Sequence, residues 1–213
     1  MLFRSFQLIL VDDGSTDGTD EYANHLRNRY AQDCFKYVRH DENRGVSRAW
    51  NSGLRATTSP YTAIVNNDIL FTPGWDTALI NALEANPRLA VVSPLSTEGR
   101  MPPDWPAGAG RHTNPAGRIG YMPLLGACFL CRTSLFDEIG LFPESMRVYW
   151  SDNWLVMAVQ NKGYECGYAQ ESYIHHQMCI TTSKIKDGTI WANDRKAFAE
   201  FEKVLAPLRP YRP

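Results

Sequence analysis

Apolar and polar positions follow one another along the first 93 residues in a pattern that predicts alternating strands and helices. Each short, wholly apolar run is followed by a segment in which apolar residues recur every three or four positions. Strands of this kind, apolar throughout, are typical of a mostly parallel sheet with helices on both faces, so we expect an α/β domain. The predicted strands are 7–13, 35–39, 61–65 and 89–93, and the predicted helices are 18–30, 45–56 and 74–87.

Residues 94–120 interrupt this alternation. Five prolines and five glycines fall within them, which excludes long regular structure and predicts a flexible loop. Loops of this length in compact domains are usually functional or disordered. Trp105, Arg111 and His112 suit a flap that faces a ligand, and a floppy insertion is the alternative interpretation.

The remainder of the chain again reads as alternating elements, and no linker or internal repeat divides it. We therefore expect one domain over residues 1–213. The predicted elements are a buried strand at 124–131, a short helix and turn at 133–144, a helix at 151–164, the short strands "YECGYA" and "SYIHH", and an amphipathic helix at 192–206.

Composition narrows the class of protein. With 44% hydrophobic and 21% charged residues, the 213-residue chain is ordinary for a globular domain. The net charge of −1 gives no basic excess for nucleic acid, and no apolar run is long enough to span a membrane. The N-terminal sequence has no small-residue cleavage site, so we interpret it as a strand and not as a signal peptide.

Five cysteines at irregular spacing do not predict a disulfide framework. Cys128 and Cys131 form a C-x-x-C pair, which occurs in zinc and redox sites. They lie within the apolar run "GACFLC" without a second such pair, so a buried strand is the better interpretation. A reducing, cytoplasmic setting follows as an expectation.

Four polar clusters remain once the core is assigned. They are "VDDGSTDGT" at 11–19, "DENRGVSRAWNSG" at 41–53, "NND" at 66–68 and "YWSDNW" at 149–154. Singly, each reads as a turn or a helix cap. Two of them directly follow predicted strands, however, and ligands of open α/β sheets bind at the carboxyl ends of strands.

Together, in this order and spacing, the clusters resemble the family 2 inverting glycosyltransferases with the GT-A fold. The resemblance covers about residues 7–182. It rests on "LILVDDGSTDGT", "NRGVSRAWNSGL", "AIVNNDILFTPGW", "GACFLCRTSLFDEIGLFPE", "YWSDNWLVMAVQNKGY" and "SYIHHQMCITT". It implies a GT-A-like domain with a nucleotide-sugar-binding half at 1–93, the loop at 94–120, an acceptor and catalytic half at 121–182, and a C-terminal helix and tail at 183–213.

The resemblance implies a nucleoside diphosphate sugar as donor, most simply a UDP-sugar. Asp13 matches the family's base-reading aspartate, while Asp12 supports the loop or the ribose, or merely caps the turn. Two groups of neighbouring residues belong to the same expected donor site. They are Gly14 and Ser15 beside Asp13, and Asn66 and Asn67 at the end of the 61–65 strand.

Arginines close to the second cluster are candidates for phosphate contacts. Relatives often carry a basic residue just before the helix asparagine, but Trp50 holds that position here. Arg44 and Arg48 would then have to reach the phosphates from elsewhere. Solvated arginines are an equally good interpretation.

A divalent cation, Mn²⁺ or Mg²⁺, is implied because the leaving diphosphate needs its charge neutralised. Asp68 lies in the place of the second acid of the family's Asp-x-Asp motif, and Asn66 replaces the first acid. His175 or His176 is the expected further ligand. Adjacent strand residues face opposite ways, so we expect one of the two to point into the site, and histidines on an exposed edge strand are the alternative.

Asp152 matches the family's general base, which deprotonates the acceptor hydroxyl. Ser151 replaces the usual glutamate before it. "SDN" is also good helix-capping sequence, so an N-cap is the competing role for Asp152. The acceptor would be a glycan or a lipid-linked sugar, and the expected location is the cytoplasm, either free or peripheral to the membrane.

One departure from the family pattern concerns the N-terminus. Relatives begin with an additional strand and helix, and "MLFRSF" is too short to replace them. We expect a minimal enzyme, a gene that has lost its 5′ part, or a fragment. A bare sheet edge is unfavourable, so a covering partner, most simply a second copy of the chain, is expected.

Two other functions compete with sugar transfer. The reduced "NND" motif and the short N-terminus suit a non-catalytic nucleotide-sugar-binding module or a truncated, inactive homologue. A nucleotidyltransferase of the sugar pyrophosphorylase type would need a glycine-rich phosphate loop after its first strand. The sequence has no such loop there.

Overall fold

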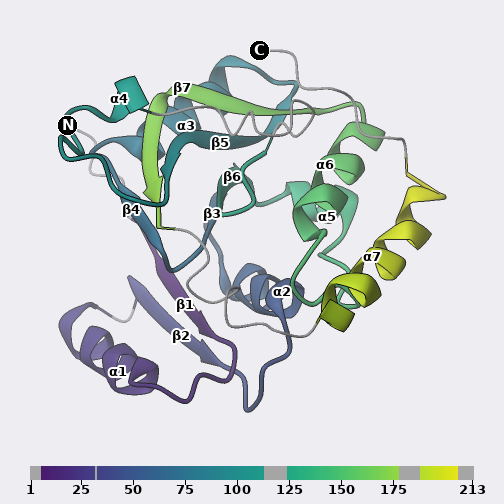
Figure 1. Ribbon diagram of the computed structural model, residues 1–213, viewed down its shortest axis with the longest axis horizontal. Helices are drawn as coiled ribbons and strands as arrows, with labels where there is room; N and C mark the ends of the chain where they lie inside the picture. The colour runs from purple at the N-terminus through teal and green to yellow at the C-terminus, as the bar shows by residue number, and fades with distance from the viewer. Residues whose placement is uncertain (1–5, 32, 113–123, 178–187, 206–213) are drawn as a thin grey trace.

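The computed structural model describes residues 6–31, 33–112, 124–177 and 188–205 (Figure 1). Strands and helices alternate through the first half as the hydrophobic pattern predicts. The elements are β1 (Leu8–Asp12), α1 (Thr19–Arg29), β2 (Phe35–Arg39), α2 (Val46–Ala56), β3 (Tyr61–Val65), β4 (Ile69–Phe71), α3 (Trp75–Ala85), β5 (Leu89–Glu98), α4 (Ala109–His112), β6 (Cys128–Arg132), α5 (Leu135–Ile139), α6 (Ser151–Asn161), β7 (Glu165–His176) and α7 (Gly188–Glu202).

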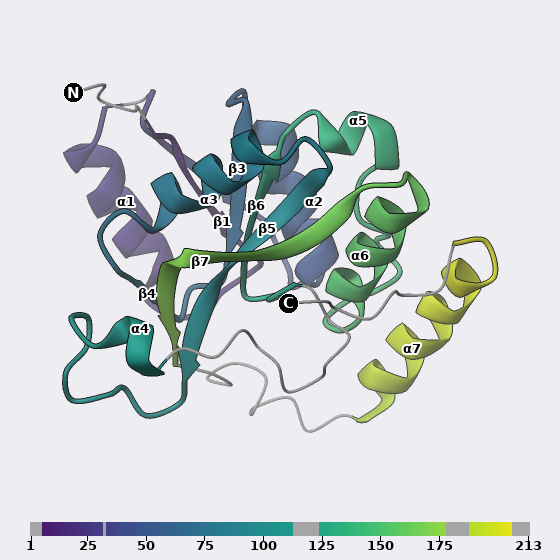
Figure 2. The ribbon, with the colours of Figure 1, turned by 90° about the horizontal axis from the view of Figure 1, so that it is seen from above.

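The strands form two sheets in the described part of the chain. A two-stranded sheet pairs β1 with β2 in parallel, and Figure 1 shows it with α1 at one corner of the molecule. A five-stranded sheet has the order β3-β6-β5-β7-β4. The long strand β7 belongs to this sheet, and Figure 2 shows that it runs from the side near α6 to β4.

The α/β fold class is confirmed, but the larger sheet is mixed in direction. Only β5 and β7 are parallel within it, and the β3–β6, β5–β6 and β4–β7 pairs are antiparallel. Wholly apolar strands report that both faces of a sheet are covered. They carry no information about direction, which is why the pattern suggested more parallel pairing than the chain has.

Helices cover both faces of the five-stranded sheet, as predicted. Successive residues of a strand point to opposite faces. Val91 and Phe129 pack in the cluster that includes Leu155 of α6, whereas Val92 and Leu130 pack against α3. The same alternation along β5 and β6 thus builds two separate apolar layers, one on each face of the sheet.

Two strand boundaries differ from the predictions because irregular pairing lets a strand continue. Pro94 was expected to end its strand, but β5 continues to Glu98 with a register shift between Pro94 and Leu95. The two predicted strands in 164–176 are one strand, β7, whose residues 170–172 lie at the same irregularity. A break in pairing therefore takes the place of a loop.

Several predictions fall partly outside the described residues. Positions 113–120 of the predicted flexible loop, Cys179 and residue 206 lie there, and α4 occupies part of the loop that is described. Cys128 and Cys131 are buried free thiols in β6, as the buried-strand interpretation predicts. None of the described helices is both long and apolar enough to cross a membrane.

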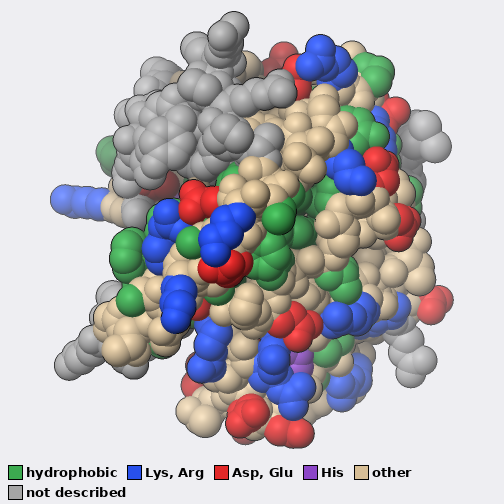
Figure 3. Space-filling view, turned by 90° about the vertical axis from the view of Figure 1, so that its right-hand side faces the viewer, with side chains coloured by type: hydrophobic (Ala, Val, Ile, Leu, Met, Phe, Trp, Pro, Cys, Tyr) green, Lys and Arg blue, Asp and Glu red, His purple; other side chains and the backbone are tan. Residues whose placement is uncertain are grey.

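The face that carries α7 is charged but mixed in sign. Figure 3 shows basic and acidic side chains interspersed across it. Two ion pairs lie at α7 and its C-terminal end: Arg195 contacts Glu202 at 2.7 Å, and Lys203 contacts Glu200 at 2.6 Å. This distribution matches the nearly neutral net charge of the sequence.

Candidate functional site

Asp12 ends β1 and is enclosed by its own neighbours. Its carboxylate accepts hydrogen bonds from the Ser15 backbone N–H at 2.8 Å and from the Tyr37 hydroxyl at 2.7 Å, and it pairs with Arg39. Burial opposes ionisation, but these hydrogen bonds and the Arg39 charge outweigh it, so the pKa of Asp12 lies below its usual 3.8. Through these contacts Asp12 holds the loop after β1, and a contact with the ribose stays a prediction.

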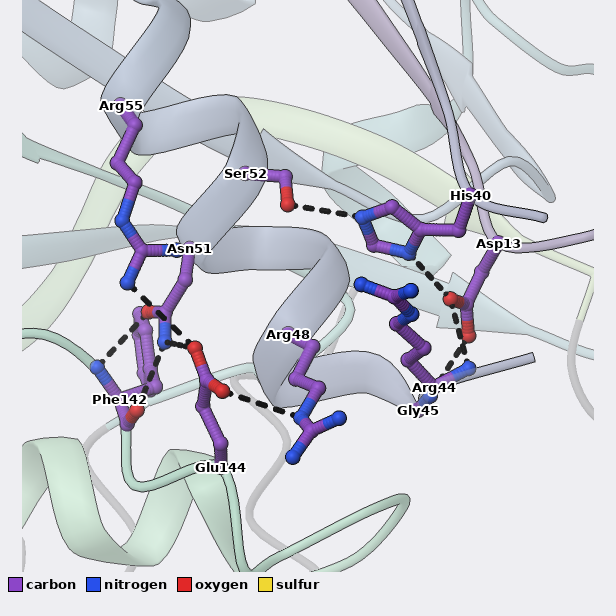
Figure 4. A network of polar contacts seen from close by, with 10 residues as sticks. All are labelled: Asp13, His40, Arg44, Gly45, Arg48, Asn51, Ser52, Arg55, Phe142 and Glu144. Atoms are coloured by element: carbon purple, nitrogen blue, oxygen red, sulfur yellow. Dashed lines mark hydrogen bonds and ion pairs between the residues drawn. The ribbon is translucent and has the colours of Figure 1, made fainter. Parts of the chain in front are cut away.

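Asp13 binds the N-terminal end of α2. Its Oδ1 accepts the Arg44 backbone N–H at 2.9 Å, and its Oδ2 accepts the Gly45 N–H at 2.7 Å. Figure 4 shows these bonds beside the start of the helix. A carboxylate at a helix N-terminus satisfies donors that have no partner within the helix. Asp13 therefore fastens the first polar cluster to the second.

His40 adds a third partner to Asp13. Its Nδ1 lies 2.7 Å from Asp13 Oδ1, and its Nε2 lies 2.9 Å from the Ser52 hydroxyl, midway along α2 (Figure 4). The sequence analysis missed His40, although a signal was present. His40 directly follows β2, as Asp13 follows β1, and the carboxyl ends of neighbouring parallel strands meet at one edge.

Gly14 makes the close approach of these two loops possible. It adopts φ +78°, and a Cβ at this position would lie 2.6 Å from the Glu42 carbonyl carbon and 2.7 Å from the Asn43 nitrogen. Both are backbone atoms, which could move only if the whole loop moved. Ser15, next along the chain, accepts a 2.9 Å hydrogen bond from Arg39 at its carbonyl. The predicted Gly14 and Ser15 thus shape the loop through their backbone.

The two candidate arginines have different surroundings. Arg48 pairs through Nε with Glu144 at 3.0 Å, and Figure 4 shows its side chain directed toward Glu144. Arg55 approaches the same carboxylate at 3.5 Å. Arg44 contributes its backbone N–H to Asp13, and the residue is exposed. A phosphate contact by either arginine stays a prediction.

The "NND" segment leads from β3 into β4, an edge strand that the sequence analysis did not predict. Asn66 and Asn67 are exposed, and the Asn66 backbone N–H donates to the Ala127 carbonyl at 2.8 Å. Asp68 is largely enclosed and lies just before β4. Three polar residues in a row thus end β3 and leave two amide side chains open to solvent.

Asp68 and His176 come together at this edge of the sheet. β4 pairs with the end of β7, and His176 Nε2 lies 3.3 Å from Asp68 Oδ1, with 13% of each side chain exposed. Neither Asp68 Oδ1 nor His176 Nδ1 has a hydrogen-bond partner among the described residues, although both atoms are buried. Buried polar atoms left in this state are costly unless something else satisfies them.

His175 lies on the opposite side of β7. It is 1% exposed, and its Nδ1 lies 2.8 Å from the Thr97 hydroxyl, with the Trp105 ring 5.7 Å away. Burial lowers the pKa of His175 below its ordinary value. Of the two neighbouring histidines, His176 is therefore the one beside Asp68, as the alternation of strand side chains requires.

The Asp68–His176 pair fits a divalent cation in its chemistry. A carboxylate oxygen and an imidazole nitrogen are ligands that Mn²⁺ accepts. The orphaned Asp68 Oδ1 is the atom that a cation would satisfy. The described ranges contain no cluster of three or more His, Cys, Asp or Glu side chains suited to a metal, so these two side chains are the metal ligands that the described part of the chain offers here.

Asp152 lies in the first turn of α6 with its carboxylate against the loop before β6. A Cβ on Gly126 would meet Asp152 Oδ2 at 2.6 Å, so a larger residue at position 126 would force this carboxylate to shift. Its Oδ1 accepts the Asn153 N–H at 2.9 Å, and burial raises the pKa of Asp152 above 3.8. The N-cap position itself belongs to Trp150, so Asp152 is not the helix cap.

Short contacts join the predicted donor and acceptor regions. Asn66 bonds Ala127, whose neighbour Gly126 lies against Asp152. On the other side, the buried Ser47 and Ser151 hydroxyls lie 2.7 Å apart and connect the first turns of α2 and α6. The structure therefore brings the four polar clusters of the sequence into one continuous region.

Trp150, two residues before Asp152, packs against the C-terminal helix. Its ring stacks on Phe198 of α7, with centroids 5.3 Å apart, and Arg195 lies over it at 5.1 Å. Trp150 is thus occupied by packing against the C-terminal helix.

Comparison with known proteins places this architecture in a family. The family model for "Glycosyl transferase family 2" matches residues 3–140, well over half of the chain. Human polypeptide N-acetylgalactosaminyltransferase 18 is 27% identical over 78% of this chain and 31% of its own length. The pre-mycofactocin glycosyltransferase of Mycobacterium tuberculosis is 26% identical over 67% of this chain and 32% of its own. The chain thus spans about a third of these two relatives.

Solved structures show the same fold. The mannosyltransferase PcManGT of Pyrobaculum calidifontis, in complex with GDP-Man and Mn²⁺, superposes on 96% of this chain and 56% of its own with a TM-score of 0.67 and 19% identity. GalNAc-T7 with UDP, GalNAc and Mn²⁺ covers 80% of this chain and 37% of its own with a TM-score of 0.62 and 14% identity. Fold and family comparison therefore agree with the resemblance in the sequence: the chain belongs to glycosyl transferase family 2.

Proposed function

We propose that the chain transfers a sugar from a nucleoside diphosphate sugar, most simply a UDP-sugar, to a hydroxyl of a glycan or glycolipid, with inversion at the anomeric carbon. The observation that carries the proposal is the chain of short contacts from Asn66 through Ala127 and Gly126 to the Asp152 carboxylate. It sets a carboxylate suited to act as a base close to the strand end that also carries Asp68.

The donor base binds beside Asp13 in this proposal. A carboxylate has about four lone-pair directions. Oδ1 receives His40 and the Arg44 N–H, whereas Oδ2 receives only the Gly45 N–H among the described donors. One direction at Oδ2 thus remains for a donor on the base edge. The exposed amides of Asn66 and Asn67 suit ribose or sugar hydroxyls.

Asp68 and His176 would hold the divalent cation. When bound, such a cation neutralises the charge of the leaving diphosphate. The relatives PcManGT and GalNAc-T7 were both solved with Mn²⁺. In this chain the contribution of Asp68 is its buried, orphaned Oδ1, and that of His176 is its Nε2 beside this oxygen.

Asp152 acts as the general base. The acceptor hydroxyl oxygen forms a bond to the anomeric carbon, the bond from that carbon to the diphosphate oxygen breaks, and the hydroxyl proton passes to the Asp152 carboxylate. The raised pKa of Asp152 makes it a stronger base than an exposed aspartate. Because the base must be ionised, transfer falls as the pH drops through this raised pKa.

The test is Asp152→Asn, which keeps the shape of the side chain and removes the base. We expect unchanged binding of UDP with Mn²⁺ by calorimetry, and transfer slower by about 10²- to 10⁴-fold, measured as acceptor-dependent release of nucleoside diphosphate. Asp137→Asn, an exposed acid on α5, is the matched control. Transfer by Asp152→Asn at the parental rate would remove Asp152 from the mechanism.

A binding module without catalysis is the second candidate. It is favoured by the small number of metal-ligating side chains, since the described residues hold only the Asp68–His176 pair at this edge. A module of this kind binds UDP and Mn²⁺ but releases no nucleoside diphosphate from any donor. The parental chain in the same release assay separates the two functions.

A further inference from the structure

Asp194 is an acid on the apolar side of α7. It is 1% exposed, and it precedes Phe198 by one helical turn. Its Oδ1 accepts the Arg147 backbone N–H at 3.0 Å, and its Oδ2 accepts the N–H groups of Val148 and Tyr149 at 2.7 and 2.9 Å. Three successive backbone donors from a segment almost fifty residues away therefore converge on one carboxylate.

The segment that Asp194 binds leads directly into a strained turn. Trp150 has φ +72°, and it is the one described residue other than glycine with a positive φ. A bulky side chain in this region costs free energy, and it persists only when surrounding contacts over-determine it. Asp194 fixes the residues before the turn, while the Phe198 stack and Arg195 fix the Trp150 ring.

The turn sets the direction in which α6 begins. The Trp150 carbonyl accepts the Trp154 N–H at 2.9 Å, which makes it the first carbonyl of the helical ladder. Asp152 follows two residues after Trp150, with its carboxylate in the narrow space beside Gly126. A change in the turn would therefore move this carboxylate against a backbone that leaves it little room.

We propose that Asp194 is a positioning residue for Asp152, so that α7 controls the alignment of the base without touching substrate. This inference rests on the proposed function. A carboxylate is required at position 194 because it accepts hydrogen bonds at both oxygens. An asparagine replaces one acceptor with a donor, which faces N–H groups and repels them.

Asp194→Asn in the full chain is the test. We expect kcat for transfer to fall by about 10²-fold, the loss typical of a reacting group displaced by about 1 Å. Asp13 and Asp68 do not contact α7 directly in the described part of the chain, although the carbonyl of Arg147, which Asp194 holds, accepts the Val46 N–H at 2.5 Å beside the Asp13 partners. We therefore expect donor KM and the affinity for UDP with Mn²⁺ to change much less than kcat. The matched control is Glu200→Gln, the same change at an exposed position of the same helix, which leaves kcat unchanged.

The pH profile separates positioning from a general loss of folded protein. Displacing the turn hydrates Asp152 and so relieves the burial that raises its pKa, which moves the acid limb of kcat to lower pH. A smaller folded fraction lowers kcat without moving this limb. A kcat loss with an unmoved limb, or a loss carried by donor KM, overturns the proposal.

A second variant approaches the turn from its other side. Phe198→Leu loosens the ring beneath Trp150 but leaves the carboxylate in place, so it keeps the proposal testable if Asp194→Asn does not fold. We expect the same kcat loss and the same shift of the limb in smaller measure. An unchanged kcat in Phe198→Leu contradicts the proposal.

The outcome also distinguishes this inference from the proposed function. If Asp152→Asn is inactive while Asp194→Asn transfers at the parental rate, only the positioning role fails. If Asp152→Asn transfers normally, or the parental chain does not turn over, both fail together.

Discussion

Asp13 and Asp68 both follow a strand, yet their surroundings differ in one decisive respect. The Asp13 carboxylate receives three groups of its own chain at 2.7–2.9 Å. Asp68 has a buried oxygen without a hydrogen-bond partner in the described ranges, and beside it lies a histidine at 3.3 Å. Asp13 thus mainly joins two loops, whereas Oδ1 of Asp68 remains able to accept a bond from a ligand.

The comparison shows how similar sequence motifs divide structural and binding roles. A buried polar atom that is fully bonded contributes to the fold, whereas one left unbonded lowers stability until a ligand satisfies it. Mutations at the two positions should accordingly affect different properties. Asp13 should matter most for stability, and Asp68 for metal-dependent binding.

Asp13→Ala should have the largest effect on the free energy of unfolding. It leaves the partly buried Gly45 N–H and His40, and the more exposed Arg44 N–H, without their acceptor, and a fully buried unsatisfied donor costs about 1–3 kcal/mol. We expect a loss of about 2–4 kcal/mol in urea unfolding. Asp41→Ala, at an exposed position nearby, is the control. A loss below about 0.5 kcal/mol would remove the structural role of Asp13.

Asp68→Ala should leave stability almost unchanged without metal, because it removes an acid that the described chain does not hydrogen-bond at Oδ1. The Mn²⁺-dependent part of UDP binding should weaken by about tenfold or more, as for other losses at metal sites. Calorimetry with and without Mn²⁺ measures this difference. Equal metal dependence in the variant and the parent would contradict the assignment of the site.

Arg48→Gln should have the smallest effect. Its ion pair with Glu144 is partly exposed, at 45% and 38% of the two side chains, and such pairs contribute about 0–1 kcal/mol. UDP affinity should stay at the parental value, because the guanidinium is engaged with Glu144 and points toward it in Figure 4. A clear loss of UDP affinity would instead support the phosphate contact suggested by the sequence.

Local patterns predicted the elements of the first half well. The segments 35–39 and 61–65 are strands with the expected bounds, and α2 and α3 begin and end within two residues of the predictions. In each case the period of apolar residues and the flanking Gly or Pro carry the information. The three-residue strand β4 was missed, since "ILF" is too short for its period to be recognised.

Long-range partners were beyond the reach of sequence patterns. Nothing local to Asn51 shows that its amide donates to the Phe142 carbonyl at 2.8 Å and that its carbonyl accepts the Phe142 N–H at 3.0 Å.

The buried partner of Asp194, by contrast, could have been predicted from the sequence. Asp194 lies on the same helical face as Phe198 and Phe201, and an acid on an apolar stripe indicates a buried partner.

Physical reasoning from the sequence predicted that the side chains of the two adjacent histidines in β7 point in opposite directions. Two adjacent histidines on a strand had to face opposite ways, and His176 lies beside Asp68 while His175 is buried near Thr97. Which histidine would point to which side depended on the register of β7 against β4. That register arises from tertiary packing and is absent from the local pattern.

The buried thiols of β6 allow the local opening of the five-stranded sheet to be measured by chemical labelling. Burial raises the pKa of Cys131 to about 12 and that of Cys128 higher still. At pH 8 only about one Cys131 in ten thousand is a reactive thiolate, so alkylation requires that the strand first separates from its neighbours. The rate at which these thiols are labelled therefore reports how often the sheet around β6 opens by local unfolding.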